Sequence, residues 1–363
     1  MGITHFSILN THPDVEVVAI CDQSSTMLNI LGKYTYIATY SDHRQMFDES
    51  QLDCVIISTP TDSHSQLAKT AIDNDIHIFL EKPFALSLEE GKGILEHLEG
   101  KTLINQVGYV NRFCEVFMEV KKLLDTQIIG EIKSFHAEMV GSTVLRDSKS
   151  GWRSKKKKGG GCMYEFASHC IDLIIYLLGQ PDQVTGSVMQ SIYSSEVEDL
   201  VRSTFLYSNA YSGTIMVNWS DATFRKPTNT VTILGTRGKI LADKHGYKIF
   251  LSESDQSNGY RKGWNSRSIT DLAQSVRFYV RGNEFTRQLD YFVDNILKKR
   301  TENIASFSEA FKTDLVIEQI VRDSALSTAE RDGSSVMTPI FKKKRKKTSW
   351  WRQILEKFNP DLS

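Results

Sequence analysis

The chain has 363 residues, of which 40% are hydrophobic and 24% are charged, and its formal net charge is zero. This composition is ordinary for a soluble globular protein of two domains, and no stretch approaches the ~18 uninterrupted apolar residues of a membrane span. The N-terminus lacks the basic and apolar regions of a secretory signal. Five scattered cysteines argue against a disulfide framework and for a reducing compartment.

Strand and helix patterns alternate along the first part of the chain. The apolar run 15–21 predicts a buried strand that ends at Asp22, and a serine after it can cap a helix. A second buried strand, 53–58, is stopped by Thr59-Pro60, and a helix follows. Short connections of this kind are typical of parallel βαβ units.

Glu81-Lys82-Pro83 closes the next apolar run, 76–80, and precedes a helical stretch that opens at Ser87. The carboxyl ends of buried parallel strands are where open α/β sheets bind ligands. Lysine carries a compact positive charge that responds strongly to a partly buried site. Lys82 is therefore a candidate catalytic residue, and the alternative is a solvated lysine after a strand.

Beyond residue 130 the pattern changes to that of an antiparallel sheet with one inserted helix. Alternating segments occupy 131–138 and 183–251. Between them, three glycines, 159–161, lead into a segment whose spacings of three and four residues predict one helix face. The side chains on that face are Glu165, His169 and Asp172. Cys162, His169 and Cys170 are the alternative metal ligands, but packing beside a helix is favoured and no metal is expected.

Several motifs carry a recognisable order and spacing: Gly2-Ile3-Thr4-His5, Ile20-Cys21-Asp22, Thr59-Pro60-Thr61 with His64, Glu81-Lys82-Pro83, Asn111-Arg112-Phe113, Gly151-Trp152-Arg153, the segment 159–172, and Gly235-Thr236-Arg237-Gly238. Taken together, these motifs resemble the Gfo/Idh/MocA family of sugar-type dehydrogenases over about residues 1–330.

The resemblance implies an α/β fold of two domains. A Rossmann-type parallel-sheet domain for NAD(P) is expected over 1–110. An α/β domain with a large, mostly antiparallel sheet is expected over 111–335, for substrate binding and oligomerisation. The helices near 284–329 close this domain and are candidates for packing against the first domain. Residues 336–363 are expected to form a basic amphipathic tail.

The resemblance also implies roles for particular side chains. Lys82 would polarise the substrate hydroxyl, His169 would accept its proton, and Glu165 would orient His169 or bind a substrate hydroxyl. The Lys82-Pro83 bond is expected to be cis. Asp22 would bind both ribose hydroxyls and repel a 2′-phosphate, which favours NAD over NADP. The other cofactor contacts are Gly2, Thr59, Pro60, Thr61, Glu81, Lys82, Trp152 and Arg153, with His64 as a weaker candidate, and the substrate contacts are Asn111, Arg112 and Asp172.

The sequence departs from the family pattern at two places. Met1-Gly2 fall on the last Met-Gly of the G-x-G-x-x-G turn, so the first strand and the two glycines that approach the pyrophosphate are missing. A start codon assigned at an internal Met explains this, and a truncated or weak cofactor site is the alternative. Either way, two neighbouring strands lose their central partner. At Glu165 the family usually has Asp, and the longer side chain needs a different rotamer to reach His169.

Together these features predict a cytoplasmic, NAD-dependent enzyme, with NADP as the less favoured cofactor. It would oxidise or reduce a hydroxyl or keto group of a sugar, cyclitol or nucleotide sugar, as a homodimer or homotetramer. Two alternatives stay open: an NAD-using glycosidase of the same fold, and a non-catalytic dinucleotide-sensing regulator. No nucleic-acid partner is expected.

The C-terminal tail has a pattern of its own. Residues 342–357 carry eight Lys and Arg against one Glu, and apolar side chains recur there at helical spacing. A basic cluster beside an amphipathic helix is typical of binding to an anionic membrane surface. The segment 341–358 is therefore a candidate for peripheral contact with the inner face of a membrane, in surface-polysaccharide synthesis. A basic extension without such a role is the alternative.

Overall fold

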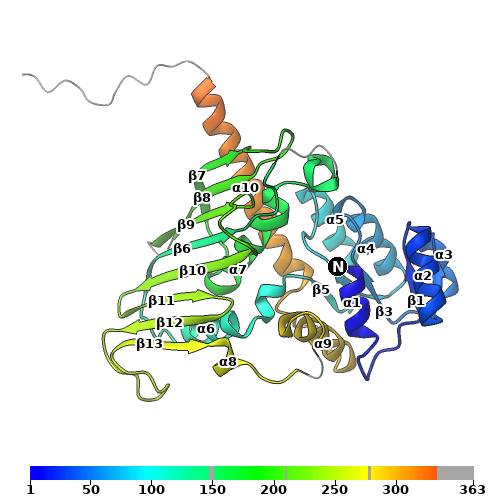
Figure 1. Ribbon diagram of the computed structural model, residues 1–363, viewed down its shortest axis with the longest axis horizontal. Coiled ribbons are helices and arrows are strands. Elements are labelled where there is room, and N and C mark those ends of the chain that lie inside the picture. The colour runs from blue at the N-terminus through cyan, green and yellow to red at the C-terminus, as the bar shows by residue number, and fades with distance from the viewer. Residues whose placement is uncertain (147–150, 209–210, 277–278, 333–363) are drawn as a thin grey trace, which may run out of the picture. The chain divides into compact units, whose positions relative to one another are not determined.

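Two sheet systems, one parallel and one mostly antiparallel, make up the body of the protein (Figure 1). The computed structural model describes residues 1–146, 151–208, 211–276 and 279–332, and the chain up to Ser324 forms one compact unit. The tail segment 341–358, for which the sequence suggests membrane contact, lies outside the described residues.

The N-terminal region alternates helices with short parallel strands, as the sequence predicts. Side chains that follow the strands start several of its helices: Ser24, Asp42 and Ser87 each accept a backbone N–H of the first turn. The elements are α1 (Gly2–Leu9), β1 (Ala19–Cys21), α2 (Ser25–Thr35), β2 (Ala38–Tyr40), α3 (His43–Glu49), β3 (Cys54–Ile57), α4 (His64–Asp73), β4 (His77–Leu80), α5 (Leu88–Leu98) and β5 (Asn105–Val107).

The parallel strands form two separate sheets, β1-β2 and β3-β4-β5. In the described part of the chain, β1 and β3 make no ladder with each other, and no strand comes before α1. Strand β1 is only half-buried, and Val18 just before it is 39% exposed. This confirms the expectation that two neighbouring strands would lack a central partner.

The second region is built on an eight-stranded sheet in the order β13-β12-β11-β10-β6-β9-β8-β7. All neighbours pair antiparallel except β6 and β9. The strands are β6 (Ile132–Val140), β7 (Gln183–Gln190), β8 (Leu200–Tyr207), β9 (Tyr211–Asn218), β10 (Thr228–Gly235), β11 (Gly238–Asp243), β12 (Gly246–Leu251) and β13 (Gly263–Ser268). The short helix α8 (Ile269–Leu272) follows β13. Fold class and sheet type therefore match the sequence-based expectation.

Helices α6 (Glu115–Asp125) and α7 (Ser168–Leu178) cover one face of this sheet. Val116, Phe117 and Val120 of α6 share one apolar core with sheet residues such as Phe135 and Ile233. The helical stretch Lys156–Leu178 is long and apolar enough to span a membrane, but 72% of its apolar window is buried in the protein, as expected for a core helix.

Helices from the end of the chain contribute to the core of the N-terminal region. Leu289 and Phe292 of α9 (Asn283–Leu297) cluster with Ile8 of α1 and Phe79 of β4. Phe307, at the start of α10 (Phe307–Asp332), lies 5.0 Å from Phe84, just after Lys82-Pro83, by ring centroid. The two regions therefore share a packed boundary, and this is where the candidate site forms.

Candidate active site

Lys82 and Glu165 join the two regions through one ion pair. Lys82 follows β4, and its bond to Pro83 is cis, as the resemblance implied. Its Nζ donates to Glu165 Oε2 at 3.1 Å and to the Glu165 carbonyl oxygen at 3.2 Å. The side chains are 13% and 19% exposed, so the pair lies in a largely dry site. The structure thus brings together two of the three predicted catalytic residues.

Glu165 lies in a π-helix rather than in an α-helix. The π-helix Met163–Ala167 precedes α7, so the α-helical spacing rule does not apply between Glu165 and His169. In the part of the chain that the structure describes, no hydrogen bond joins these two side chains. The other Glu165 oxygen, Oε1, accepts from Arg153 Nη2 at 3.3 Å instead. Burial alone would raise the pKa of Glu165, but Lys82 and Arg153 lower it below its ordinary value.

His169 lies on the first turn of α7, in surroundings that favour the neutral imidazole. Burial and the charge of Lys82 lower the pKa of His169 well below its ordinary value. Its ring meets that of Tyr109 edge to face, with centroids 6.2 Å apart. Its buried Nδ1 has no hydrogen-bond partner among the described residues. A neutral imidazole with an unused nitrogen is chemically able to accept a proton.

Glu81 is held by His5, a residue that the sequence did not single out for a role. Glu81 Oε1 lies 2.6 Å from His5 Nε2, and its Oε2 accepts the Lys82 backbone N–H at 3.2 Å. Both side chains are almost fully buried. Burial opposes ionisation, but His5 and Lys82 lower the pKa of Glu81. Glu81 therefore ties the backbone of Lys82 to helix α1, and its expected cofactor contact stays a prediction. In the sequence, the signal for this contact was a histidine within the apolar segment that forms α1.

Arg112 and Asp172 form a second, deeply buried ion pair. Arg112 Nε and Nη2 donate to Asp172 at 2.7–3.1 Å, and Nη1 donates to the Ile304 carbonyl. Their side chains are 2% and 1% exposed. Burial raises the pKa of Asp172, and Arg112 offsets part of this rise. Arg112 and Asp172 use their hydrogen-bonding groups on each other. Their expected contact with the substrate therefore stays a prediction, and this arrangement does not favour it.

Asn111 differs from its neighbour Arg112. It is 2% exposed, and neither Nδ2 nor Oδ1 of its amide has a hydrogen-bond partner among the described residues. A buried amide that uses none of its hydrogen-bonding capacity calls for an explanation. This observation supports Asn111 as a substrate contact.

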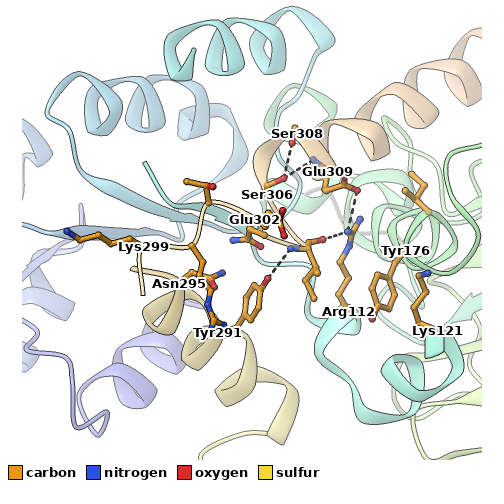
Figure 2. Close-up of a pocket in the computed structure, with 15 residues that line it drawn as sticks. Arg112, Lys121, Tyr176, Tyr291, Asn295, Lys299, Glu302, Ser306, Ser308 and Glu309 are labelled. Atoms are coloured by element: carbon orange, nitrogen blue, oxygen red, sulfur yellow. Dashed lines mark hydrogen bonds and ion pairs between the residues drawn. The ribbon is translucent and has the colours of Figure 1, made fainter. Parts of the chain in front are cut away.

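Figure 2 shows that the guanidinium of Arg112 reaches a cavity, between Tyr176 and Glu309. The cavity has a volume of about 1140 Å³. Tyr291 on its wall accepts the Ile304 backbone N–H at 3.2 Å, and Glu309 lies 3.9 Å from Arg112 Nη1. Neither Lys82 nor His169 lines this cavity, so it is distinct from the predicted catalytic group.

The expected cofactor residues lie at the ends of the parallel strands. Asp22 follows β1, is exposed, and uses one carboxyl oxygen to accept the Ser24 N–H at 2.7 Å. Gly2 opens α1 beside β3, since a Cβ at Gly2 would lie 3.0 Å from Ser58 Oγ. An exposed carboxylate and a helix amino end suit the ribose and phosphate groups of NAD. The donor set therefore fits the cofactor.

Residues 59–64 form the loop after β3. Thr61 is buried, and a Cβ at Gly159 would lie 3.2 Å from its Oγ1, so the glycine-rich loop closes on this edge. His64 Nδ1 lies 3.0 Å from the Pro83 carbonyl, and its Nε2 lies 3.1 Å from that of Thr59. Burial lowers the pKa of His64. His64 thus holds two loops together, which is a structural role.

The loop with Trp152 and Arg153 packs on the glycine-rich run. Arg153 stacks on the Trp152 ring at 4.8 Å, and its carbonyl accepts the Gly161 N–H at 3.1 Å. A Cβ at Gly160 would lie 2.3 Å from the same carbonyl, so only glycine fits there. The loop therefore places Arg153 against Glu165, and its contact with the cofactor stays a prediction.

Two models of protein families match the chain. One, described as an oxidoreductase family with an NAD-binding Rossmann fold, matches residues 1–109. The other, described as the GFO/IDH/MocA C-terminal domain, matches residues 117–241.

Individual proteins share the same organisation. An uncharacterized oxidoreductase of Schizosaccharomyces pombe is 27% identical over 300 residues, 79% of this chain and 77% of that protein. A scyllo-inositol 2-dehydrogenase (NADP(+)) of Bacillus subtilis is 25% identical over 304 residues, 81% of this chain and 76% of that protein. The structure of a levoglucosan dehydrogenase with NADH and levoglucosan has a TM-score of 0.78 at 20% identity, and the match covers 89% of this chain and 93% of that chain.

Proposed function

The chain belongs to the Gfo/Idh/MocA family of NAD-binding oxidoreductases, and on that premise we propose that it is a dehydrogenase of a hydroxyl group on a sugar, cyclitol or nucleotide sugar. The observation that carries the proposal is the convergence of Lys82 and Glu165, from two regions of the chain, in a largely buried pair. The names of the inositol and levoglucosan dehydrogenases support the substrate class.

Lys82 and His169 have separate roles in the proposed reaction. Lys82 uses two hydrogen bonds on Glu165, and an ammonium has three donors, so one remains for a substrate oxygen. In a dry site, this charge stabilises the oxygen as its proton leaves. His169, neutral because of burial and Lys82, accepts that proton. NAD, when bound, takes the hydride from the carbinol carbon.

Two substitutions test these roles. Lys82→Met and His169→Ala should each lower kcat by about 100-fold, because each removes charge stabilisation or proton transfer. NADH affinity, measured by fluorescence titration, should change little. Levoglucosan and scyllo-inositol are the first substrates to assay, by NADH formation. Lys101→Met and His97→Ala, on exposed parts of the surface, are matched controls.

Near-normal turnover in either variant would remove that residue from the mechanism. Cleavage of a nitrophenyl glycoside without net NADH formation would replace the proposal with an NAD-using glycosidase. NAD binding without turnover of any sugar would favour the regulator.

We also propose that the open face of the large sheet forms a homodimer or homotetramer. Leu234, Phe250 and Trp264 on β10, β12 and β13 are 44%, 38% and 58% exposed. The strand registers place them in one row across the sheet, with Lys239 of β11 between the first two. An exposed apolar row of this kind marks an association surface.

A further inference from the structure

The π-helix that carries Glu165 is capped by an acidic residue from a distant part of the chain. Glu198, just before β8, accepts the Met163 backbone N–H through Oε1 at 2.7 Å. Its own carbonyl accepts the Cys162 N–H at 2.9 Å. The first N–H groups of a helix have no partner within the helix, so Glu198 supplies the acceptors for this one.

The backbone before the π-helix is shaped to admit the Glu198 carboxylate. Gly161 has φ 108°, a left-handed conformation that favours glycine. A Cβ at Gly161 would lie 2.4 Å from Glu198 Oε1, so the carboxylate occupies the space of a side chain. Burial raises the pKa of Glu198, while the Met163 N–H and Lys156 oppose that rise.

Glu198 is itself held on a rigid support. The next residue, Asp199, donates its backbone N–H to the Gln190 carbonyl at 2.8 Å. Its carboxylate accepts the Trp219 indole N–H at 2.6 Å and three backbone N–H groups of residues 192–194 at 2.6–2.8 Å. A cap on such a support can define where the helix begins.

We propose that Glu198 is a positioning residue that sets the register of the π-helix and so aims Glu165 at Lys82. Side chains project around a helix axis in turn, so a slip of one residue in the start of the π-helix would turn Glu165 away from the ammonium. The carboxylate also balances the positive helix end. The inference rests on the proposed function, because it assigns Glu198 an effect through Glu165.

A double-mutant cycle tests this inference. Glu198→Ala should lower kcat by about tenfold, the factor for one lost charge-assisted hydrogen bond, with little change in KM for NAD. Glu198→Gln keeps an acceptor for the Met163 N–H and should restore most of the activity. Glu196→Ala, an exposed carboxylate two residues away, is the matched control. In a Glu165→Ala background, Glu198→Ala should cost almost nothing further, since the residue it positions is gone.

A second readout needs no substrate. Trace acetic anhydride labels lysines according to their access and charge, and peptide mass spectrometry resolves Lys82. Both Glu165→Ala and Glu198→Ala should raise Lys82 labelling by a similar factor, while labelling of the exposed Lys101 stays constant. Should Glu198→Ala fail to fold, Glu198→Asp shortens the cap and takes its place.

The outcomes distinguish a failure of the proposed role of Glu165 from a failure of the positioning role of Glu198. If Glu165→Ala leaves both kcat and Lys82 labelling unchanged, the proposed role of Glu165 fails. If Glu165→Ala has its effect but Glu198→Ala has none, the positioning role is overturned. Equal losses of kcat with and without Glu165 would show a purely structural cap and would also overturn it.

Discussion

Breaking the Arg112–Asp172 pair tests whether these residues serve the fold or the substrate. Asp172→Asn keeps the shape of the side chain but leaves a guanidinium that is 2% exposed without its counter-charge. Removing one partner of a buried pair typically costs about 3–5 kcal/mol, which for a chain of this size corresponds to roughly 4–7 °C in Tm. Thermal unfolding followed by circular dichroism measures the change. Asp125→Asn, an exposed carboxylate on α6, should shift Tm by less than about 1 °C.

Substitution of the partner residue, Arg112→Met, should change how the stability of the protein depends on pH. Arg112→Met removes the charge that offsets the raised pKa of Asp172, so the folded-state pKa moves further above the unfolded one. A carboxyl with a raised folded pKa contributes stability below its unfolded pKa and loses it as pH rises through the folded pKa. Relative to the parent protein, Arg112→Met should therefore gain stability from pH 8 to pH 5. An apolar pair, Arg112→Met with Asp172→Leu, should recover part of the loss.

A normal Tm for Asp172→Asn together with a raised KM for the sugar would refute this reasoning. It would instead establish the substrate contact that the family resemblance implied. If the apolar double variant were less stable than both single variants, the pair would stabilise the fold by more than charge compensation.

Two further predictions follow from the cofactor edge and the open sheet. Asp22→Ala should raise the NADP/NAD ratio of kcat/KM by about tenfold, because a carboxylate near a 2′-phosphate is repulsive; an unchanged ratio would place the discriminating contact elsewhere. Light scattering at micromolar concentration should show a dimer or tetramer, and Phe250→Asp with Trp264→Asp should shift it to monomer, while Leu297→Asp on α9 should not; a parent protein that is already monomeric would end the oligomer proposal.

The fold was predictable where local patterns carry it. Strands that end before Asp22, Thr59 and Glu81 were visible as apolar runs with turn residues after them, and each appears near the expected place. The first is shorter than the expected 15–21, since it covers only Ala19–Cys21, and it is half-buried rather than buried. The absence of a ladder between β1 and β3 in the described residues also agrees with the expectation that two neighbouring parallel strands would be unpaired.

The site was predictable as a set of residues but not as a geometry. Lys82, Glu165 and His169 were found from motifs, yet the contact between Glu165 and His169 was expected from α-helical spacing. The π-helix changes the angular relation between them, and the local sequence pattern does not distinguish a π-helix from an α-helix. The contact at its start is tertiary, since Gly161 and Glu198 meet across 37 positions of sequence.

The same limit applies to His5. Its partner Glu81 lies 76 positions away, so no local pattern pairs them. Glu81 and Glu198 have parallel tasks in the two regions of the chain: Glu81 holds the backbone of Lys82 to α1, and Glu198 holds the helix of Glu165 to the large sheet. The Lys82–Glu165 ion pair forms where these two separately anchored groups meet. A substrate oxygen that binds the remaining donor of Lys82 would share the ammonium with Glu165. Arg153, on the other Glu165 oxygen, helps to hold that carboxylate beside the ammonium.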